Sequence, residues 1–282
     1  MSKPWRGALY AALIIAALYY LLPLYVMLTT SLKSMDEIRA GNLLSLPGTI
    51  SFDAWRKAWG SACTGIECSG LSGYFWNSVR MVIPAVLIST ALGALNGYVL
   101  SKWRFRGSEW VFAMLLFGLY IPFQVLLLPM AQTLGWFGLA RSMFGLVFVH
   151  IVCGIAGTTL FFRNYYVGIP DELIKAARLD GAGFWRIFLR IVLPMSLPIL
   201  MVTLIWQFTQ IWNDFLFGLV FSAGDSQPIT VGLNNLANTS TSVKEYNVNM
   251  AAALIAALPT IAVYVLAGKY FVRGLAAGAV KG

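Results

Sequence analysis

Several apolar stretches of this chain contain side chains that can form hydrogen bonds or ionise. A polar group inside a bilayer is energetically costly, and it is a functional candidate by default. The candidates for contact with a ligand are Gln124, Gln207, Gln210, Asn213 and Asp214. Gln207 and Gln210 are three residues apart, which predicts a shared helix face continued by Asn213 and Asp214. The alternative is that these groups join neighbouring helices by interhelical hydrogen bonds.

Residues for other kinds of chemistry are few. The single histidine, His150, lies far in the sequence from Cys63 and Cys68, so we predict no metal-ligand cluster and interpret His150 as a buried packing residue. The sequence contains no H-E-x-x-H, G-x-S-x-G or G-x-x-x-x-G-K-[ST] motif. We therefore predict neither an enzyme active site nor nucleotide binding by this chain. Cys63 and Cys68 lie in a polar segment and predict a small disulfide in an oxidising compartment, with two free thiols as the alternative.

The composition indicates an integral membrane protein. Of the 282 residues, 59% are hydrophobic and only 11% are charged. The first apolar run is too long for a signal-peptide core, so we interpret it as a retained span. We predict an all-α, polytopic membrane protein with a single transmembrane domain over 1–282. Six apolar stretches are long enough to cross a bilayer: 8–31, 74–101, 110–133, 143–163, 194–221 and 249–271.

The charge distribution predicts the orientation of these spans. Most of the 20 Lys and Arg residues fall on one side if the N-terminus is cytoplasmic. The short loops on the other side are nearly free of positive charge, which is where the positive-inside rule is most reliable. Both termini and the segment 163–193 are then cytoplasmic, and the long loop 32–73 is outside. The net charge of +9 fits this anchoring role better than nucleic-acid binding.

The segment 169–193 is polar and amphipathic although it lies between two apolar stretches. Pro170 precedes Asp171, a good N-cap residue, and a short helix over 172–180 follows. Gly181 is typical of a chain turn. A second helical stretch carries apolar residues on one face and two arginines on another: Phe184, Ile187, Phe188, Ile191, Arg186 and Arg190. These short helices either meet a soluble partner or anchor the loop in the membrane interface.

The segment resembles a known signature. Ala176-Ala177 with Gly181, followed by Ile191-Val192-Leu193-Pro194, is similar to the cytoplasmic "EAA" motif of permease subunits in binding-protein-dependent ABC importers. The surrounding residues look like the carbohydrate branch, which includes the smaller maltose permease subunit. Lys175 stands where the family usually has glutamate, so a salt bridge of that glutamate is not carried over. Two further blocks are similar to the same branch: Trp212-Asn213-Asp214-Phe215 and the tail Gly274 to Gly282.

The resemblance implies a type I ABC importer permease bundle with a cytoplasmic coupling helix. The implied residues that couple to the ATPase are Lys175, Ala176, Ala177, Asp180 and Gly181. The implied partners are a second permease subunit, two ATPase subunits that bind ATP and magnesium, and an extracytoplasmic sugar-binding protein. Membrane lipid surrounds such a subunit, and the location is the bacterial inner membrane. The tail is expected to reach the ATPases as well.

The implied substrate is a mono- or oligosaccharide such as glucose or mannose. The smaller subunit of such a pair need not contact the sugar, because its partner can hold the site. A permease for a polyol or a glycerol phosphate is the alternative within this family. A self-sufficient secondary transporter or channel is the alternative outside it, but the sequence shows neither an internal repeat nor a buried acidic pair. The loop 32–73 either contacts the binding protein or caps the first two spans.

Overall fold

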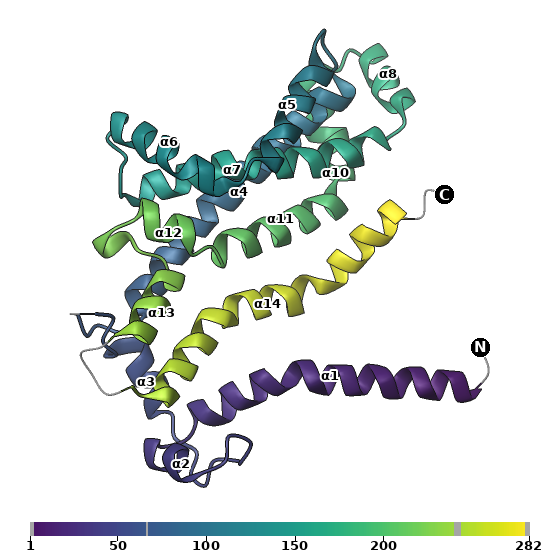
Figure 1. Cartoon of the computed structure of the whole chain (residues 1–282). Coiled ribbons are helices and arrows are strands. Elements are labelled where there is room, and N and C mark those ends of the chain that lie inside the picture. The colour runs from purple at the N-terminus through teal and green to yellow at the C-terminus, as the bar shows by residue number, and fades with distance from the viewer. Residues whose placement is uncertain (1–2, 66, 240–243, 280–282) are drawn as a thin grey trace. The chain divides into compact units, whose positions relative to one another are not determined.

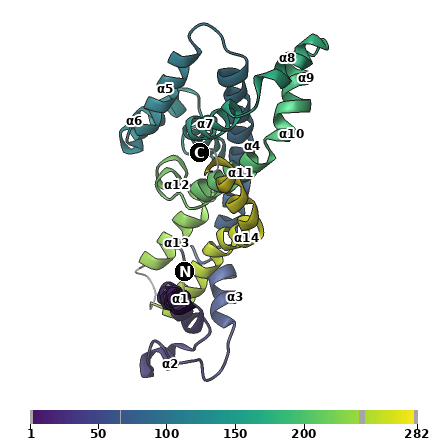
Figure 2. The same cartoon turned by 90° about the vertical axis from the view of Figure 1, so that its right-hand side faces the viewer.

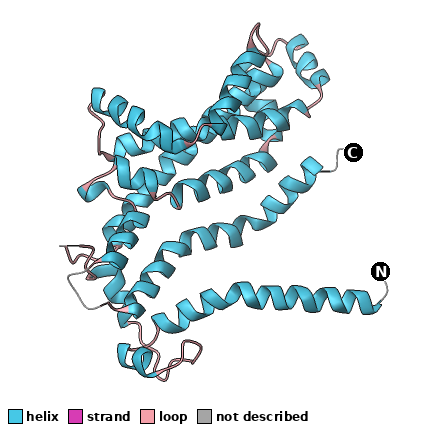
Figure 3. Cartoon of the chain, in the orientation of Figure 1, coloured by secondary structure: helices cyan, strands magenta, loops and turns pink. Residues whose placement is uncertain are grey.

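The structure, a computed structural model, describes residues 3–65, 67–239 and 244–279. Within these ranges every regular element is helical and no strand is present, which confirms the all-α prediction (Figure 3). The chain divides into two compact units. The first unit consists of Met1–Gly73 with Gly232–Leu258, and the second of Tyr74–Val231 with Pro259–Gly282. The expectation of a single domain over 1–282 stays a prediction.

The first unit begins with a long apolar helix. Its elements are α1 (Lys3–Ser31), α2 (Met35–Ala40), α3 (Asp53–Gly60), most of α13 (Ile229–Asn238) and the beginning of α14 (Tyr246–Ala279). The apolar stretch Trp5–Ser31 has a mean hydropathy of 2.2, and 0% of it is buried within the chain. Lipid or another protein must therefore cover α1.

Contacts within the first unit fold the loop 32–73 against helix ends. The indole N–H of Trp55 donates to the hydroxyl of Ser31 at the end of α1, at 3.2 Å. The ammonium group of Lys57 lies 2.5 Å from the carboxylate of Glu245, next to the start of α14. The loop is thus a folded element.

The second unit contains the remaining helices (Figure 1). The bounds of the elements of this unit are α4 (Ser72–Lys102), α5 (Ser108–Tyr120), α6 (Phe123–Trp136), α7 (Met143–Val167), α8 (Asp171–Leu179), α9 (Phe184–Ile187), a π-helical turn (Phe188–Val192), α10 (Leu193–Met195), α11 (Leu197–Trp212), α12 (Leu216–Phe221) and a 3₁₀ turn (Gly224–Ser226). In both Figure 1 and Figure 2, α8 lies near the end of α4 that leads into α5.

Small residues allow α4, α7 and α11 to pack closely. A Cβ atom at Gly97 of α4 would lie 2.7 Å from the Cβ of Phe162 on α7. A Cβ atom at Gly157 of α7 would lie 2.7 Å from the indole ring of Trp206 on α11. Apolar side chains gain little from leaving lipid, so close backbone approach is what holds such helices together.

Four predicted spans are confirmed as single helices among the described residues. The helices long and apolar enough to cross a membrane are Trp5–Ser31, Ser72–Lys102, Met143–Val167 and Tyr246–Gly268. They correspond to the predicted spans 8–31, 74–101, 143–163 and 249–271. The proline residues inside these helices, Pro23, Pro84 and Pro259, do not end them.

The other two predicted spans are interrupted helices instead of single continuous ones. The span 110–133 is divided into α5 and α6, which meet at 105°. Ile121 precedes Pro122 and is extended, because proline disfavours the helical conformation of the residue before it. The span 194–221 contains α11, bent by 78° from the helical segment before it, and the separate α12. The described chain has six spans only if each bent pair counts as one.

Candidate functional site

The helix α8 is bounded by local signals that the sequence contains. Gly181 has a positive φ of 76° just after the helix. Its N–H donates to Arg178 O at 3.0 Å, and the N–H of Ala182 donates to Ala177 O at 2.9 Å. These two bonds form a Schellman motif, which explains a glycine at this position. At the other end the N-cap residue is Pro170 without a side-chain bond, so the prediction of Asp171 as N-cap is wrong.

The two faces of α8 differ in character. Ile174 and Ala177 are buried in a core with Tyr98 of α4 and Ile187 of α9. A second face carries Leu173, Ala176 and Leu179, and these residues follow one another at a spacing of three. Leu173 is 42% exposed and Leu179 is 89% exposed. An exposed apolar ridge on a polar helix is the feature expected of a docking surface.

An ion pair attaches the first residue of α8 to the last residue of α4. The ammonium group of Lys102 lies 2.5 Å from the carboxylate of Asp171 and donates to Ile169 O at 2.6 Å. The Lys102 side chain is only 5% exposed. We call Lys102, Ile169 and Asp171 the α4–α8 latch. The hydrogen bond from Lys102, and then its charge, hold the pKa of the Asp171 carboxyl below its ordinary value.

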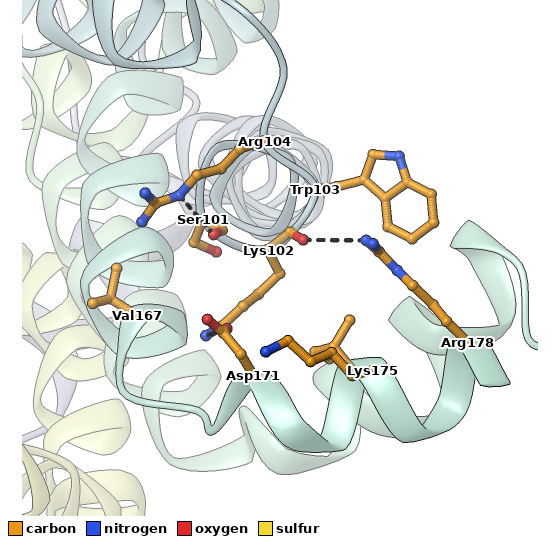
Figure 4. A pocket seen from close by; sticks show the side chains of 9 residues that line it. Ser101, Lys102, Trp103, Arg104, Val167, Asp171, Lys175 and Arg178 are labelled. Carbon is orange, nitrogen blue, oxygen red and sulfur yellow. Dashed lines mark hydrogen bonds and ion pairs between the residues drawn. The ribbon is translucent and has the colours of Figure 1, made fainter.

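A second attachment lies near the other end of α8. The guanidinium carbon of Arg178 lies 4.1 Å from the ring centre of Trp103, a cation–π contact. The same side chain donates to Lys102 O at 3.4 Å (Figure 4). Trp103 packs edge-on against Phe184, which follows α8 in the chain. The helix is therefore held to the end of α4 from both of its ends.

A pocket of about 690 Å³ opens between α8 and the end of α4 (Figure 4). Its lining is mostly polar and basic, with apolar walls. The lining residues are Ser101, Lys102, Trp103, Arg104, Val167, Asp171, Ile174, Lys175 and Arg178.

The predicted ligand-contact residues differ in their exposure. Gln207 on α11 is 2% exposed, and its amide fills the space beside Gly154 of α7. This placement favours the alternative of packing between helices for Gln207. Gln210 on the same helix is exposed, as are Asn213 and Gln124.

Asp214 has a structural role. Its carboxylate accepts hydrogen bonds from the backbone N–H groups of Gly218 at 3.1 Å and Phe217 at 3.4 Å, at the start of α12. His150 is buried, as predicted, and its Nε2 lies 3.7 Å from the Asp214 carboxylate. Asp214 therefore caps a helix and faces a histidine instead of an open surface.

The polar segment between α3 and α4 contains the two paired cysteines. Cys63 and Cys68 are joined by a disulfide. The hydroxyl of Thr239, also in the first unit, accepts a hydrogen bond from the N–H of Gly65 at 2.9 Å within this disulfide loop. Among the described residues no group of His, Cys, Asp and Glu side chains is arranged to hold a metal ion.

A comparison with protein families places this chain. The family described as binding-protein-dependent transport system inner membrane component matches residues 77–276. The chain belongs to this family. The permease is thus a multi-pass transport protein of the inner membrane.

Named relatives cover nearly the whole permease. A probable ABC transporter permease protein of Pyrococcus horikoshii is 39% identical over 99% of this chain and 98% of its own length. A xylose/arabinose import permease of Haloferax volcanii is 32% identical, with 96% and 92% covered. A glucose import system permease of Saccharolobus solfataricus is 32% identical, with 95% and 92% covered.

A solved structure shares the fold of the permease. It belongs to a bacterial ABC transporter involved in the import of the acidic polysaccharide alginate. The TM-score is 0.81 at 23% sequence identity, and 96% of this chain and 99% of that chain are covered. The similarity supports the type I importer fold predicted from the EAA-like segment.

The predicted coupling residues of the permease lie on different faces of α8 and in the turn that follows it. Ala176, Asp180 and Gly181 are exposed, Lys175 lines the pocket, and Ala177 is buried. Sequence reasoning missed the exposed Leu173 and Leu179, although their spacing with Ala176 was a readable signal. It also missed the attachments to Lys102 and Trp103, which no local pattern shows. The predicted tail runs in α14 as far as Ala279, and residues 280–282 lie outside the described residues.

Proposed function

We propose that this permease is one of two membrane subunits of an ATP-driven importer of a neutral mono- or oligosaccharide, with α8 as its coupling helix. The observation that supports the proposal is the exposed ridge of Leu173, Ala176 and Leu179 on a helix attached at both ends. An apolar ridge of this kind inserts into a groove of a partner, in this proposal the ATPase. The exposed residues Asp180 and Gly181 form the edge of that contact.

The partner supplies the chemistry in this proposal. The sequence has no phosphate-binding loop, so two separate ATPase subunits bind ATP and magnesium. The second permease subunit completes the translocation path, and an extracytoplasmic binding protein delivers the sugar. The cytoplasmic side of the membrane is the side of α8, and both termini lie there as well, according to the distribution of Lys and Arg.

The attachments of α4 suggest how motion of α8 reaches the other side. At one end, the α4–α8 latch and the Arg178–Trp103 contact join α8 to α4. At the opposite end of α4, the amide of Asn77 donates to Asp225 O at 2.6 Å and to Gln227 O at 3.0 Å. Because α4 is a continuous helix, a displacement of α8 is transmitted along it to the segment after α12.

The proposed substrate of the permease is a sugar. Relatives are named for the import of xylose and arabinose or of glucose, and we propose glucose or mannose for this permease. Gln210, Asn213 and Gln124 have exposed amide side chains, and amides can form hydrogen bonds with a sugar. These three residues therefore remain the candidate substrate residues. A polyol or glycerol phosphate is the competing substrate class.

The test is a charge placed on the ridge. Leu179→Asp changes a residue that is 89% exposed, so the fold is unaffected. We expect the variant to lose the ATPase on affinity purification from gently solubilised membranes and to lose sugar-stimulated ATP hydrolysis. The matched control for retention of the ATPase is Leu46→Asp, which alters another exposed leucine in the loop 32–73. Its stimulated hydrolysis is not compared, because this loop is a candidate contact of the binding protein. Retention of the ATPase and of stimulated hydrolysis by Leu179→Asp would refute the coupling role of α8.

A panel of substrates completes the test. Glucose, mannose, arabinose, glycerol and glycerol phosphate are compared by stimulation of ATP hydrolysis in the reconstituted complex with its binding protein. Stimulation by glycerol phosphate alone would replace the sugar assignment. Uptake by the isolated permease in vesicles without an ATPase would instead identify a self-sufficient transporter.

A further inference from the structure

The pocket behind α8 has features that docking of the exposed ridge does not use. Asp171, Ile174, Lys175 and Arg178 recur at helical spacing on the side of α8 that faces α4. The ridge of Leu173, Ala176 and Leu179 lies on another side. We propose that this pocket binds the phosphate headgroup of an anionic phospholipid.

The charges of the pocket are unbalanced. Lys102, Arg104, Lys175 and Arg178 line it, together with a single carboxylate, Asp171. The α4–α8 latch already uses Asp171 to neutralise Lys102. Among the described residues, neither Lys175 nor Arg178 has a carboxylate within the 4.0 Å of an ion pair. An anion from outside the chain would therefore be attracted to these two side chains.

A neighbouring ion-pair network does not remove the excess of positive charge in the pocket. The carboxylate of Glu109 lies 2.8 Å from the guanidinium of Arg163 and 4.0 Å from that of Arg104. One carboxylate thus serves two arginines, and Arg163 is the nearer of them. The charge of Arg104 at the edge of the pocket is therefore only partly compensated, and its side chain is more than half exposed.

The position of the pocket identifies the source of the anion. It lies where two membrane-spanning helices end, at Lys102 of α4 and Val167 of α7. Val167, Ile174 and Trp103 provide apolar walls, and tryptophan is typical of the level of lipid headgroups. Basic pockets at such helix ends bind anionic headgroups, whereas a soluble anion would gain nothing from the apolar walls.

The two side chains have complementary geometry for a phosphate. Figure 4 shows Arg178 extending from α8 toward Trp103 and the backbone of Lys102, and Lys175 extending along α8 toward Asp171, with open space between the two side chains. The guanidinium of Arg178 presents a planar fork of donors, and the ammonium of Lys175 acts as a point charge. A headgroup bound there would contact α8 and α4 at once and strengthen their attachment.

The experiment measures lipid binding by the purified full-length permease in detergent. Dioleoyl phosphatidylglycerol and dioleoyl phosphatidylcholine are titrated separately, and bound lipid is counted by native mass spectrometry. We expect phosphatidylglycerol to be preferred. The double variant Lys175→Gln/Arg178→Gln should weaken its binding by roughly 10- to 30-fold, at about 1 kcal/mol per basic residue. Lys175→Gln alone, a change at an exposed residue that leaves the Arg178–Trp103 contact in place, should weaken it roughly fivefold.

The control is Arg186→Gln/Arg190→Gln, which removes two exposed charges outside the pocket lining. Equal binding of both lipids, or equal weakening by control and pocket variants, would overturn the proposal. Displacement of the lipid by glycerol phosphate at matched concentration would show a site for soluble anions and would also overturn it. If the pocket variants lose the ATPase but keep lipid binding, the pocket belongs to the protein partner instead. No transport assay is involved, so failure here is distinct from failure of the proposed function.

Discussion

The ammonium group of Lys102 and the carboxylate of Asp171 lie 2.5 Å apart although 69 residues separate them in the chain. This pair joins the last residue of a membrane-spanning helix to the first residue of the helix with the exposed ridge. The lysine is buried and the carboxylate is mostly exposed, so the two partners contribute unequally. The lysine also donates a hydrogen bond to the Ile169 carbonyl, so it makes two contacts where the carboxylate makes one.

Substitutions in the α4–α8 latch should therefore differ in their effects. Asp171→Asn should lower the free energy of unfolding by less than about 1 kcal/mol, because the exposed carboxylate is screened by solvent. Lys102→Met should lower it by about 1–3 kcal/mol, because the Ile169 carbonyl also loses its donor. Thermal unfolding of the purified permease measures both. A larger effect of Asp171→Asn than of Lys102→Met would contradict this account.

The latch should be insensitive to pH over the physiological range. The pKa of Asp171 is lowered by the hydrogen bond and charge of Lys102, so its stabilising contribution is fully present above the ordinary carboxyl value of about 3.9. It is lost as the pH falls through the lowered pKa. We expect the difference in Tm between the wild type and Asp171→Asn to be constant from about pH 8 to 5. A difference that shrinks already near pH 6 would assign the effect to another group.

Gly181 allows a charge to be tested separately from a backbone change. Its φ is positive and a Cβ there would meet nothing within 4 Å. Gly181→Asp and Gly181→Asn place side chains of equal shape in a conformation that both tolerate better than most residues. We expect both variants to fold, each at a cost of about 1 kcal/mol.

Only the aspartate variant should stop sugar-stimulated ATP hydrolysis, since it adds a negative charge beside Asp180. The assay uses the reconstituted complex, and the asparagine variant is the control. Normal stimulation and import by Gly181→Asp would remove Gly181 from the docking surface.

The close packing of α4 on α7 predicts a size limit at Gly97. In Gly97→Val the new Cβ would approach the backbone nitrogen of Arg163 at 2.8 Å, and this atom cannot move without shifting α7. We expect Gly97→Val to lower the free energy of unfolding by about 1–3 kcal/mol and to reduce the yield of the permease in membranes. Gly118→Val on α5 is the control, because a Cβ there meets nothing within 4 Å. Similar Tm values for the two variants would show that α4 and α7 are not in close contact.

The disulfide predicts that Cys63 and Cys68 are oxidised and that the loop containing them lies outside the cytoplasm. Cys63 and Cys68 in intact cells should react with a membrane-impermeant maleimide only after reduction, since an outer loop is exposed to an oxidising compartment. The double variant Cys63→Ser/Cys68→Ser should lose about 2 kcal/mol of stability at most, because the closed loop is short. Labelling without reduction would show free thiols. Labelling only after the cells are permeabilised would reverse the proposed topology.

Local patterns in the sequence determined much of this protein. Apolar runs of sufficient length determined the four long spanning helices, because crossing a bilayer requires about 20 apolar residues. Pro170 precedes the start of α8 and Gly181 follows its end. Proline restricts the backbone angle φ, and glycine allows the positive φ with which the helix ends. The alternation of apolar residues with Arg186 and Arg190 likewise predicted the short helices after it, and burial of Ile187 and Phe188 confirms it.

The tertiary structure alone decided which neighbour each side chain meets. Helical spacing places Ala176 and Ala177 on different faces of α8, but only the fold decides that the face of Ala177 packs against α4. Asp171 is a residue type that favours the N-cap position, but its carboxylate instead binds a lysine that is 69 residues away in the sequence. Gln207 and Gln210 lie three residues apart, and only the fold places the first against Gly154. Such outcomes depend on contacts between distant segments, and no local spacing encodes them.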